Sequence, residues 1–533
     1  MLPPPPIRGA FRTDLPARAL YSEGAGIYRI VPQAVALPAD EEDLRVLLHW
    51  AVTNKVPLTP RGAGSSVTGS NVGPGVVVDL TRMQPEILEL FPASGTARTG
   101  AGIRWSQLNA EAAKHGLRLP PDPSSGPFAT LGGMVSTNAS GSRSVKYGSM
   151  RRWVLGLTLL TGKGELVRLH RGTTSGLQLP RKELFEQEEL IRSRFPRTTK
   201  NSSGYALNAW LDSGDDLDLF IGAEGTLGIV TEIEWSLSPI PSHRAGLRVT
   251  LGDLGRLTEA VEALLALAPS ALELLDRTFL ELVERGGLNR PPADLPGPSA
   301  ESMLLVEFEG DDQKALRGTV ADAVRAVKGV AIDIETAIRP EEEEQLWHLR
   351  HAASPIIADL PPGRRSLQVI EDACVPVARM GEYITAVRGL ARQLEVPVVI
   401  FGHAGDGNIH VNLLPQTMTE GWEDAVRALH REITAVVIRL GGTTSGEHGD
   451  GRIRSSVLEE LYGPGIVRLF HAVKDSLDPS GILNPGVKLG QPGDAPLHDL
   501  KVGALAAPIP EAIAEELREI ERKGDYLRDR LMS

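Results

Sequence analysis

Phe401-Gly-His-Ala-Gly-Asp-Gly-Asn-Ile-His-Val-Asn412 is the stretch around which this chain is organised. Val398–Phe401 is continuously apolar and predicts a buried strand, whereas Ile409–Leu414 alternates apolar and polar side chains for most of its length, as a half-buried strand does. The glycines between them allow the backbone to turn sharply. The sequence therefore predicts a strand–turn–strand unit that brings His403 and His410 close together.

A second segment, Ser445-Gly-Glu-His-Gly-Asp-Gly-Arg452, adds a carboxylate and another imidazole. Two imidazoles and one carboxylate are a common ligand set for Zn²⁺ and similar transition metals. We hypothesise that His403, His410 and Glu447 bind a divalent metal of the Zn, Mn or Fe type, and that His448 carries out proton chemistry beside it. A pair of hydrogen-bonded strand histidines without a metal stays open as the alternative.

The length and charge of the chain indicate a multidomain globular protein. Its 533 residues are too many for one hydrophobic core, so two or more domains are expected. A hydrophobic fraction of 41% and a charged fraction of 23% are ordinary for soluble proteins. The 68 acidic residues exceed the 56 basic ones, giving a net charge of −12. This charge argues against nucleic acid as a partner, because a broad nucleic-acid surface needs a basic face.

The single cysteine, Cys374, limits the redox chemistry that the chain can hold by itself. It excludes a disulfide within the chain and an iron–sulfur cluster bound by the chain's own thiolates. The sequence lacks an 18-residue apolar run, so no transmembrane segment is predicted, and its first residues do not have the pattern of a signal peptide. We expect a cytoplasmic protein; peripheral attachment to a membrane through a partner stays open.

A glycine-rich loop, Arg61-Gly-Ala-Gly-Ser-Ser-Val-Thr-Gly-Ser70, lies between two predicted strands, Val56–Pro60 and Gly75–Leu80. Consecutive backbone N–H groups in such a loop can wrap an anion such as pyrophosphate. The loop is not a P-loop, since no Gly-Lys-Ser/Thr follows. It is not a Rossmann fingerprint either, because the next element is a strand. An ordinary glycine-rich turn is the alternative for this segment taken alone.

Two further glycine-rich regions, Pro120–Ser142 and Asp218–Trp235, flank a predicted hairpin of strands Trp153–Leu160 and Glu165–Leu169. Small residues dominate the first region and permit close approach of the backbone to a large flat ligand. A predicted helix, Ala39–Asn54, precedes all of these segments, with Asp40 as its N-cap.

Four motifs in this order resemble the FAD domain of the vanillyl-alcohol-oxidase, or PCMH-type, flavoproteins: Pro60–Gly69, Thr130–Gly141, Lys146–Gly148 and Gly222–Val230. The resemblance implies a two-subdomain FAD-binding domain over residues 30–240. It implies noncovalent FAD, because Ser65 and Ser66 stand where some relatives carry a flavin-linked histidine. The cofactor-binding residues that it implies are Pro60, Arg61, Gly62, Ala63, Gly64, Ser65, Ser66, Thr68, Gly69, Pro121, Thr130, Gly133, Asn138, Ser140, Gly141, Tyr147, Glu224, Gly228, Ile229, Val230 and Asn484.

After Pro239 the pattern changes to helices, such as Leu254–Leu267 and Asp312–Val327, between strands such as Met303–Glu309. This α+β pattern is typical of an antiparallel sheet with helices on one face. We expect an N-terminal extension, the FAD-binding domain, an antiparallel-sheet α+β domain and a charged tail helix, over residues 1–29, 30–240, 241–490 and 491–533.

The second half resembles the FAD-linked oxidase C-terminal domain of D-2-hydroxyacid dehydrogenases, a family of D-lactate, glycolate and D-2-hydroxyglutarate enzymes. The resemblance rests on the stretches His403–Asn412, Ser445–Gly451 and Asp478–Gly486. It implies FAD-dependent oxidation of a small D-2-hydroxy acid to the 2-oxo acid. It supports His403, His410 and Glu447 as metal ligands, with His448 as general base.

The resemblance also implies residues that bind the substrate. Asn412 matches a family substrate contact, and Arg350 matches the arginine that pairs with the substrate carboxylate, a contact that a planar guanidinium suits. Relatives that use dicarboxylates carry a lysine at about Ile370. Its absence here argues against 2-hydroxyglutarate, unless Arg364 or Arg365 substitutes for that lysine.

Because the chain has no cluster of its own, we expect its electrons to pass to a separate acceptor, such as an iron–sulfur protein, an electron-transfer flavoprotein or a quinone. The sequence leaves open the particular acid, the metal, the acceptor and a homodimer. One alternative function is a non-redox flavin transferase of the alkyl-glycerone-phosphate synthase type. Another is an accessory FAD-binding subunit, in which the metal-site residues would be expected to be lost.

Overall fold

The computed structural model describes most of the chain. It covers residues 3–83, 88–173, 175–284, 299–351, 360, 363–490, 497–503, 506, 511 and 514–515, without the side chains of His348 and His351. The Gly- and Pro-rich stretch 286–298, which its composition predicts to be a loop, and nearly all of the predicted tail helix lie outside the described residues. No helix in the described part of the chain combines the length and the apolar character needed to cross a bilayer.

The first part of the chain, up to Pro239, contains a four-stranded sheet in the order β1-β2-β4-β3. Its strands are β1 (Ala10–Arg12), β2 (Ala34–Leu37), β3 (Leu58–Arg61) and β4 (Val76–Asp79). The short α1 (Leu15–Leu20) and the longer α2 (Glu41–Asn54) pack beside it. The predicted cap of α2 is confirmed: the Asp40 carboxylate accepts hydrogen bonds from the backbone N–H groups of Glu42 and Asp43.

A five-stranded antiparallel sheet follows, in the order β5-β6-β10-β8-β9. Its strands are β5 (Leu88–Phe91), β6 (Thr96–Gly100), β8 (Val154–Thr161), β9 (Leu166–His170) and β10 (Gly228–Ser236). The predicted hairpin is confirmed as β8 and β9. The associated helices are α3 (Trp105–Ala113), α4 (Leu131–Thr137), α5 (Ser144–Tyr147), α6 (Arg181–Glu186), α7 (Glu188–Arg194), α8 (Leu207–Ser213) and α9 (Leu217–Phe220).

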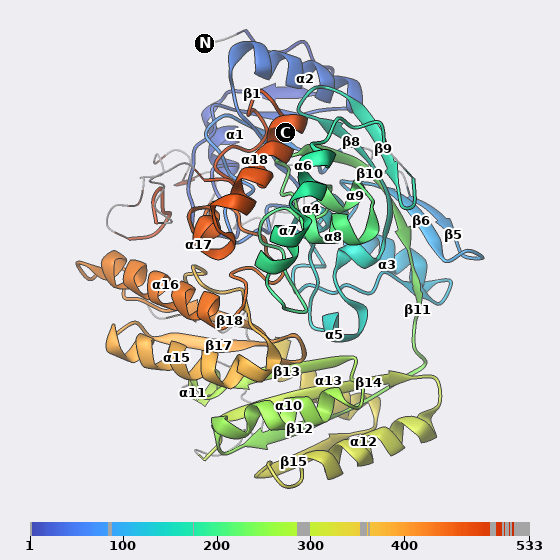
Figure 1. The fold of residues 1–533 in the computed structure, drawn as a ribbon, viewed down its shortest axis with the longest axis vertical. Helices are drawn as coiled ribbons and strands as arrows, with labels where there is room; N and C mark the ends of the chain where they lie inside the picture. Colours follow the sequence, from blue (N-terminus) through green and yellow to red (C-terminus); the bar gives the residue numbers. More distant parts are fainter. Residues whose placement is uncertain are drawn as a thin grey trace.

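The short pair β7 (Leu117–Arg118) and β11 (Ser238–Pro239) leads into a seven-stranded antiparallel sheet, ordered β15-β12-β14-β13-β17-β18-β16 (Figure 1). This sheet confirms the α+β, antiparallel prediction for the second half. Its strands are β12 (His243–Leu251), β13 (Ala271–Asp276), β14 (Ser302–Gly310), β15 (Asp333–Ala337), β16 (Ala373–Cys374), β17 (Val398–His403) and β18 (Asn408–Leu413).

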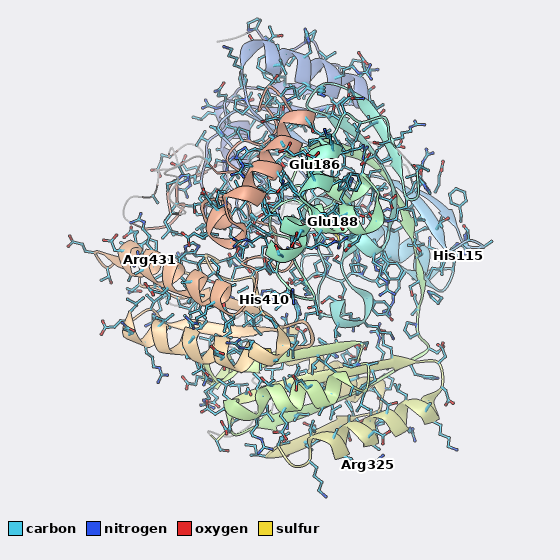
Figure 2. All side chains as sticks on the ribbon, viewed as in Figure 1. His115, Glu186, Glu188, Arg325, His410 and Arg431 are labelled. Carbon is cyan, nitrogen blue, oxygen red and sulfur yellow. The ribbon has the colours of Figure 1, made fainter. Side chains whose placement is uncertain are left out.

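Helices cover one face of the seven-stranded sheet and form its main core. They are α10 (Leu257–Leu265), α12 (Gln313–Val327), α15 (Met380–Gln393) and α16 (Trp422–Arg439). The opposite face turns toward the first part of the chain and also meets α11 (Arg277–Leu282) and α13 (Pro340–His351). Figure 2 shows His410 at this junction, whereas Arg325 and Arg431 lie at the margin of the molecule.

The chain then returns to its first part. The helices α17 (Leu458–Tyr462) and α18 (Pro464–Leu477) pack into the core beside the five-stranded sheet, with Tyr462 and Phe470 fully buried. Ile482 and Leu483 join the core of the four-stranded sheet. The segment after Arg452 therefore connects the two parts of the chain. The domain limits expected from the sequence stay a proposal.

Buried ion pairs hold the two parts in register. Lys488 Nζ lies 2.9 Å from Asp450 Oδ2 and 3.3 Å from Glu224 Oε1, and all three side chains have no exposed surface. Arg143, from the first part, binds Glu307 of β14 through two hydrogen bonds of 2.8 and 2.6 Å. Charges removed from water stabilise a structure only when they are closely paired, so these contacts fix one relative placement.

We predict that Lys488→Met lowers the free energy of unfolding by about 3–5 kcal/mol, because two carboxylates are then buried without their cation. The midpoint of urea unfolding measures this loss. The matched control is Lys182→Met, whose side chain is 91% exposed beside Glu186 and whose loss should change stability by less than about 0.5 kcal/mol. Equal midpoints for the two variants would contradict the prediction.

Candidate functional site

The strand pair β17–β18 places the two predicted metal-ligating histidines. Phe401 pairs with His410 and His403 with Asn408 in the antiparallel register. Gly407 takes the left-handed conformation in the turn, at φ 69°, where a side chain would also collide with the Val375 carbonyl. As a result the Nε2 atoms of His403 and His410 lie 3.3 Å apart, with the rings nearly perpendicular.

Glu447 reaches this pair from the second predicted segment. Its Oε1 lies 2.9 Å from His403 Nε2 and 3.4 Å from His410 Nε2. Its Oε2 accepts hydrogen bonds from the Ser140 hydroxyl, from the Gly141 N–H at 2.9 Å and from the Lys200 ammonium at 2.9 Å. One oxygen is therefore held by the first part of the chain, and the other is directed at the histidines.

The arrangement fits a divalent metal. The Nε2 atoms of His403 and His410 and a Glu447 oxygen lie within 4.8 Å of one another, all on buried residues. Each histidine engages an oxygen through its other nitrogen: His403 Nδ1 lies 2.6 Å from Glu273 Oε1, and His410 Nδ1 lies 2.9 Å from the Glu371 carbonyl. Metal-bound histidines usually have such a partner, because it fixes the ring and its tautomer.

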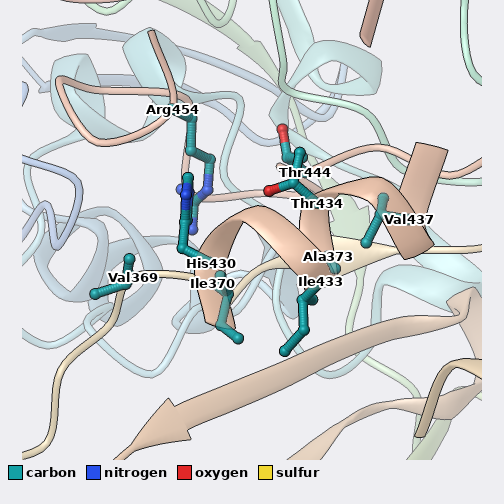
Figure 3. A pocket seen from close by; sticks show the side chains of 9 residues that line it. All are labelled: Val369, Ile370, Ala373, His430, Ile433, Thr434, Val437, Thr444 and Arg454. Atoms are coloured by element: carbon teal, nitrogen blue, oxygen red, sulfur yellow. The ribbon is translucent and has the colours of Figure 1, made fainter. Parts of the chain in front are cut away.

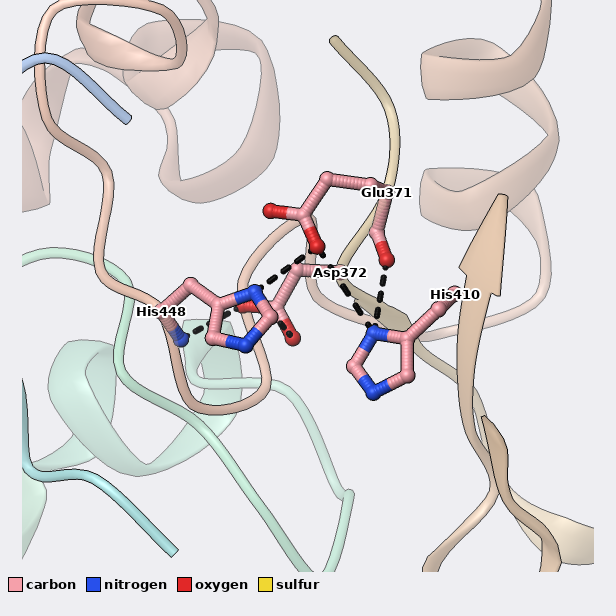
Figure 4. A group of neighbouring side chains, drawn as sticks. All are labelled: Glu371, Asp372, His410 and His448. Atoms are coloured by element: carbon pink, nitrogen blue, oxygen red, sulfur yellow. Dashed lines mark hydrogen bonds and ion pairs between the residues drawn. The ribbon is translucent and has the colours of Figure 1, made fainter. Parts of the chain in front are cut away.

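A second group of possible ligands, Glu371, Asp372, His410 and His448, overlaps the first (Figure 4). Its carboxylates are already engaged by protein groups. Asp372 accepts from the backbone N–H groups of Glu447 and His448, at 3.0 and 2.8 Å to Oδ2. Glu371 Oε1 accepts from Arg454 at 2.9 Å. The group of His403, His410 and Glu447 is therefore the better candidate for a metal.

His448 differs from its neighbours in exposure. Its side chain is 35% exposed, whereas those of His403, His410 and Glu447 are 5–7% exposed. Its ring stacks on that of His410, with centroids 5.2 Å apart. Its Nδ1 lies 2.7 Å from Glu371 Oε2, and its Nε2 lies 3.7 Å from Glu447 Oε1. A small molecule at the cluster can thus reach His448 through Nε2.

The site concentrates charge, and its pKa values reflect this. Burial disfavours charge on Glu447, but Lys200 and His403 outweigh burial and hold its pKa well below the usual range. Burial likewise opposes the ionised form of Glu371, but His448, His410 and Arg454 lower its pKa. Burial lowers the pKa of His410, yet its contacts with Glu371 and Glu447 raise it to about 10. A metal bound here would compete with a proton for His410.

Arg350 of α13 lies beside the cluster. Its Nε donates to Glu273 Oε2 at 2.6 Å, and its guanidinium lies 5.1 Å from the centre of the Phe401 ring. The other oxygen of Glu273 is the one that contacts His403. Burial raises the pKa of Glu273, but His403 and Arg350 lower it to about 2. One ionised carboxylate thus joins the arginine to a candidate metal ligand.

Asn412 lies two residues beyond His410 on β18 and therefore projects from the same face of the sheet. It is buried, and its Oδ1 accepts a hydrogen bond from the Ser366 hydroxyl at 3.0 Å. The structure thus places the predicted Asn412 on the strand face that carries the candidate metal ligand.

The residues predicted to hold FAD, together called the cradle, include a glycine-rich loop that is partly open to solvent. Residues 62–67 are half-buried, and the N–H groups of Ala63, Gly64 and Ser65 donate no hydrogen bond to another residue that the structure describes. A Cβ on Gly62 would collide with the Thr130 hydroxyl, and one on Gly225 would lie 3.1 Å from Pro60. Such donor groups on a loop without side-chain bulk fit a pyrophosphate.

The other predicted cofactor residues have varied surroundings. Thr130 accepts from Gly133 N–H as the N-cap of α4, and Asn138 ends that helix in the left-handed conformation. Ser66, Thr68 and Ser70 share hydroxyl contacts. Arg61 donates a hydrogen bond to the Tyr21 carbonyl, and Gly69 lies against the Tyr28 ring. The remaining residues of the set are buried: Pro121, Gly228, Ile229 and Val230.

Several of these residues contact the second part of the chain. The Glu224 carboxylate accepts from the N–H groups of Asp450 and Gly451, at 2.7 and 3.0 Å. Asn484 Nδ2 donates to the carbonyls of Ser70 and Glu224. The Tyr147 hydroxyl donates to Glu309 at 2.5 Å. Ser140 and Gly141 bind Glu447, so the candidate cofactor and metal sites adjoin each other.

Sequence reasoning missed several charged residues of the site: Lys200, Glu273, Glu371, Asp372 and Arg454. Each is buried or nearly so, although none was assigned a role from the sequence. A lone glutamate in the apolar strand Ala271–Asp276 was a usable signal for Glu273, since a buried charge needs a partner. The partners of Lys200 and Arg454 lie far from them in the sequence, so the spacing of residues gave no signal for these two contacts.

Known proteins resemble this chain over most of its length. Residues 240–487 match the family of FAD linked oxidases, C-terminal domain, and residues 32–170 match an FAD binding domain. A D-lactate dehydrogenase of Anaerostipes hadrus is 32% identical over 85% of this chain and 89% of its own length. Glycolate oxidase subunit GlcD of Bacillus subtilis is 30% identical, covering 88% and 92%.

The fold has a counterpart among solved structures. A 4-ethylphenol oxidase from Gulosibacter chungangensis superposes with a TM-score of 0.67 at 16% identity, covering 91% of this chain and 94% of that protein. At this identity the likeness shows the PCMH-type fold alone. The family matches and the sequence relatives establish that the chain is a flavoprotein oxidoreductase that belongs to the family of FAD-linked oxidases.

Proposed function

We propose that the protein oxidises a small D-2-hydroxy acid to the 2-oxo acid with noncovalent FAD and a divalent metal. The observation that carries the proposal is the convergence of His403 Nε2, His410 Nε2 and Glu447 Oε1 beside the half-exposed ring of His448. The names of the relatives, D-lactate dehydrogenase and glycolate oxidase subunit, point to the same class of substrate.

Each residue of the site has a separate task in this proposal. A divalent metal held by His403, His410 and Glu447 would polarise the substrate hydroxyl and lower its pKa. His448 accepts the hydroxyl proton through Nε2, since its Nδ1 is occupied by Glu371. Arg350 binds the substrate carboxylate with the guanidinium nitrogens that Glu273 leaves free.

The binding of FAD is assigned to the glycine-rich segments of the first part of the chain. The loop from Arg61 to Gly69 would hold the pyrophosphate of FAD through backbone N–H groups, and the segments around Thr130, Ser140 and Glu224 would line the rest of the molecule. When bound, FAD supplies the two-electron acceptor for the α-hydrogen of the substrate. The contact of Ser140 and Gly141 with Glu447 supports one continuous site.

The surroundings of the site favour a monocarboxylic acid such as lactate or glycolate over 2-hydroxyglutarate. Ile370 stands where dicarboxylate-using relatives carry a lysine, and it is buried against α16. Arg364 and Arg365, the candidates to replace that lysine, are exposed, and Arg365 donates to the Arg364 carbonyl. Arg350 alone is therefore assigned to a substrate carboxylate.

The remaining parts of the proposal concern partners. With a single buried cysteine in the chain, electrons leave for a separate acceptor, namely an iron–sulfur protein, an electron-transfer flavoprotein or a quinone. We propose a cytoplasmic enzyme, with membrane attachment through that acceptor. The intact cluster of candidate metal ligands argues against an accessory subunit, and the half-exposed His448 favours proton transfer over the transferase alternative.

We predict that the purified protein contains FAD and that, without oxygen, one enantiomer of a 2-hydroxy acid bleaches its flavin absorption. D-lactate, L-lactate, glycolate and both 2-hydroxyglutarates form the panel, and absorbance at the flavin band is the measurement. Glycolate, which has no stereocentre, controls for size. A flavin that stays oxidised with every acid would refute the proposed function.

We predict that His403→Ala and His410→Ala each lose bound metal and nearly all flavin reduction by substrate. Replacing a group that only orients a ligand costs about 10–100-fold in metal affinity, so removing a ligand costs more. Elemental analysis after dialysis gives the metal content per chain. The control, His471→Ala, removes an exposed histidine of α18, and it should keep the metal. Variants of the cluster that retain metal would exclude this ligand set.

For Arg350 we predict a defect in substrate binding. Arg350→Met should lower kcat/KM by about 10–150-fold, which corresponds to the roughly 1.5–3 kcal/mol of a hydrogen bond to a charged group. Steady-state kinetics with an artificial acceptor measure it. The control is Arg388→Met, which removes an arginine of helix α15 that pairs with Asp276 of strand β13. It should leave KM unchanged. A similar KM for all three proteins would remove Arg350 from the site.

A further inference from the structure

We propose that Glu371, held in place by Arg454, is a positioning residue that orients His448 for proton transfer. The inference rests on the proposed function, in which His448 accepts the hydroxyl proton. It extends that function by naming a carboxylate–imidazole pair beside the metal ligands. Glu371 would fix the His448 ring so that Nε2 alone faces the substrate.

The contact between the two side chains is direct. Glu371 Oε2 lies 2.7 Å from His448 Nδ1, and Figure 4 shows the carboxylate facing the near edge of that ring. The backbone of His448 is fixed as well, since its N–H donates to Asp372 Oδ2 at 2.8 Å. Adjacent acidic residues thus hold both the backbone and the ring of His448. A side chain that is 35% exposed would otherwise have rotational freedom.

Arg454 is what fixes Glu371. Its Nη2 donates to Glu371 Oε1 at 2.9 Å, and its Nη1 donates to the Gly449 carbonyl at 2.7 Å. Gly449 directly follows His448, so the arginine joins the carboxylate to the loop that carries the imidazole. The Arg454 side chain is 1% exposed and lies beside His430 and the apolar residues of α16 (Figure 3). Because a buried guanidinium is costly without a close opposite charge, Arg454 holds the Glu371 carboxylate in one position.

In this arrangement Oε1 of Glu371 faces a permanent cation, and Oε2 faces the reacting imidazole at 2.7 Å and the His410 Nδ1 atom at 3.6 Å. When the substrate O–H bond breaks, a new N–H bond forms on His448 Nε2, and the electron pair of the O–H bond remains on the substrate oxygen. The positive charge that then develops on the ring lies next to Glu371 Oε2. A carboxylate at this place stabilises the imidazolium and keeps the correct tautomer beforehand, as in other carboxylate–histidine pairs.

Glu371 has two alternative roles, and each predicts a different outcome when the carboxylate is removed. It could itself be a metal ligand, since it belongs to the overlapping group with Asp372, His410 and His448. It could instead serve only as the counterion of Arg454. A ligand would be needed for metal content, a counterion would matter for stability alone, and a positioning residue would matter for the proton-transfer step.

The test is Glu371→Gln in the enzyme loaded with FAD and metal. We expect the rate constant of anaerobic flavin reduction by the active D-2-hydroxy acid to fall by about 100-fold or more, with metal content and FAD content unchanged. The apparent Kd of the substrate should change less than threefold. The solvent deuterium isotope effect on flavin reduction should increase, because proton transfer then limits the rate.

The matched control is Asp276→Asn, which alters a buried carboxylate paired with Arg388 in the same sheet. It should lower thermal stability and leave the rate and the isotope effect as in the unmodified protein. Should Glu371→Gln fail to fold, the double variant Glu371→Gln/Arg454→Met removes the unpaired cation and should fold with the same kinetic defect.

Three results would overturn the inference. Unchanged flavin reduction in Glu371→Gln would refute it while leaving the proposed function intact. Loss of the metal would identify Glu371 as a ligand. A slower rate with an unchanged isotope effect would show that Glu371 does not act on the proton-transfer step. If no acid bleaches the flavin of the unmodified protein, the proposed function fails first, and the inference fails with it.

Discussion

The division of Glu447 between two sets of partners is the interaction on which this structure depends. One carboxylate oxygen is held by Ser140, Gly141 and Lys200 of the first part of the chain, and the other faces the histidines of the seven-stranded sheet. The position of the candidate metal site is therefore set relative to the FAD-binding cradle and not by the sheet alone. The proposed reaction needs that relation, because in it the substrate contacts both the metal and the flavin.

Around this carboxylate, the protein pairs each imidazole with an oxygen acceptor. Glu273 contacts His403, and Glu371 contacts His410 through its carbonyl and His448 through its carboxylate. Cations in turn hold these acids: Arg350 binds Glu273, and Arg454 binds Glu371. Because ionised groups are costly to bury unpaired, such alternating charges restrict the side chains to one arrangement. In the proposed reaction, that rigidity would position the substrate hydroxyl and its proton.

Much of the fold followed from local patterns. The apolar run before His403 and the alternation after it predicted β17 and β18, and the acidic cap at Asp40 predicted the start of α2. Glycine-rich motifs in a fixed order identified the FAD-binding part, since small residues are required wherever backbone approaches a ligand. The histidines and Glu447 were named as ligands because their residue types suit a metal, and the structure brings all three together.

The sequence by itself therefore determined the element types, the family and the residues whose chemistry is visible in short motifs. Only the tertiary structure decided the partners of Glu447, the contact of Arg454 with Glu371 and the return of α18 to the first core. Lys200 and Glu447 lie 247 positions apart. A contact between such distant residues depends on how two sheets and their helices pack, and neither periodicity nor spacing along the chain encodes that packing in a readable form.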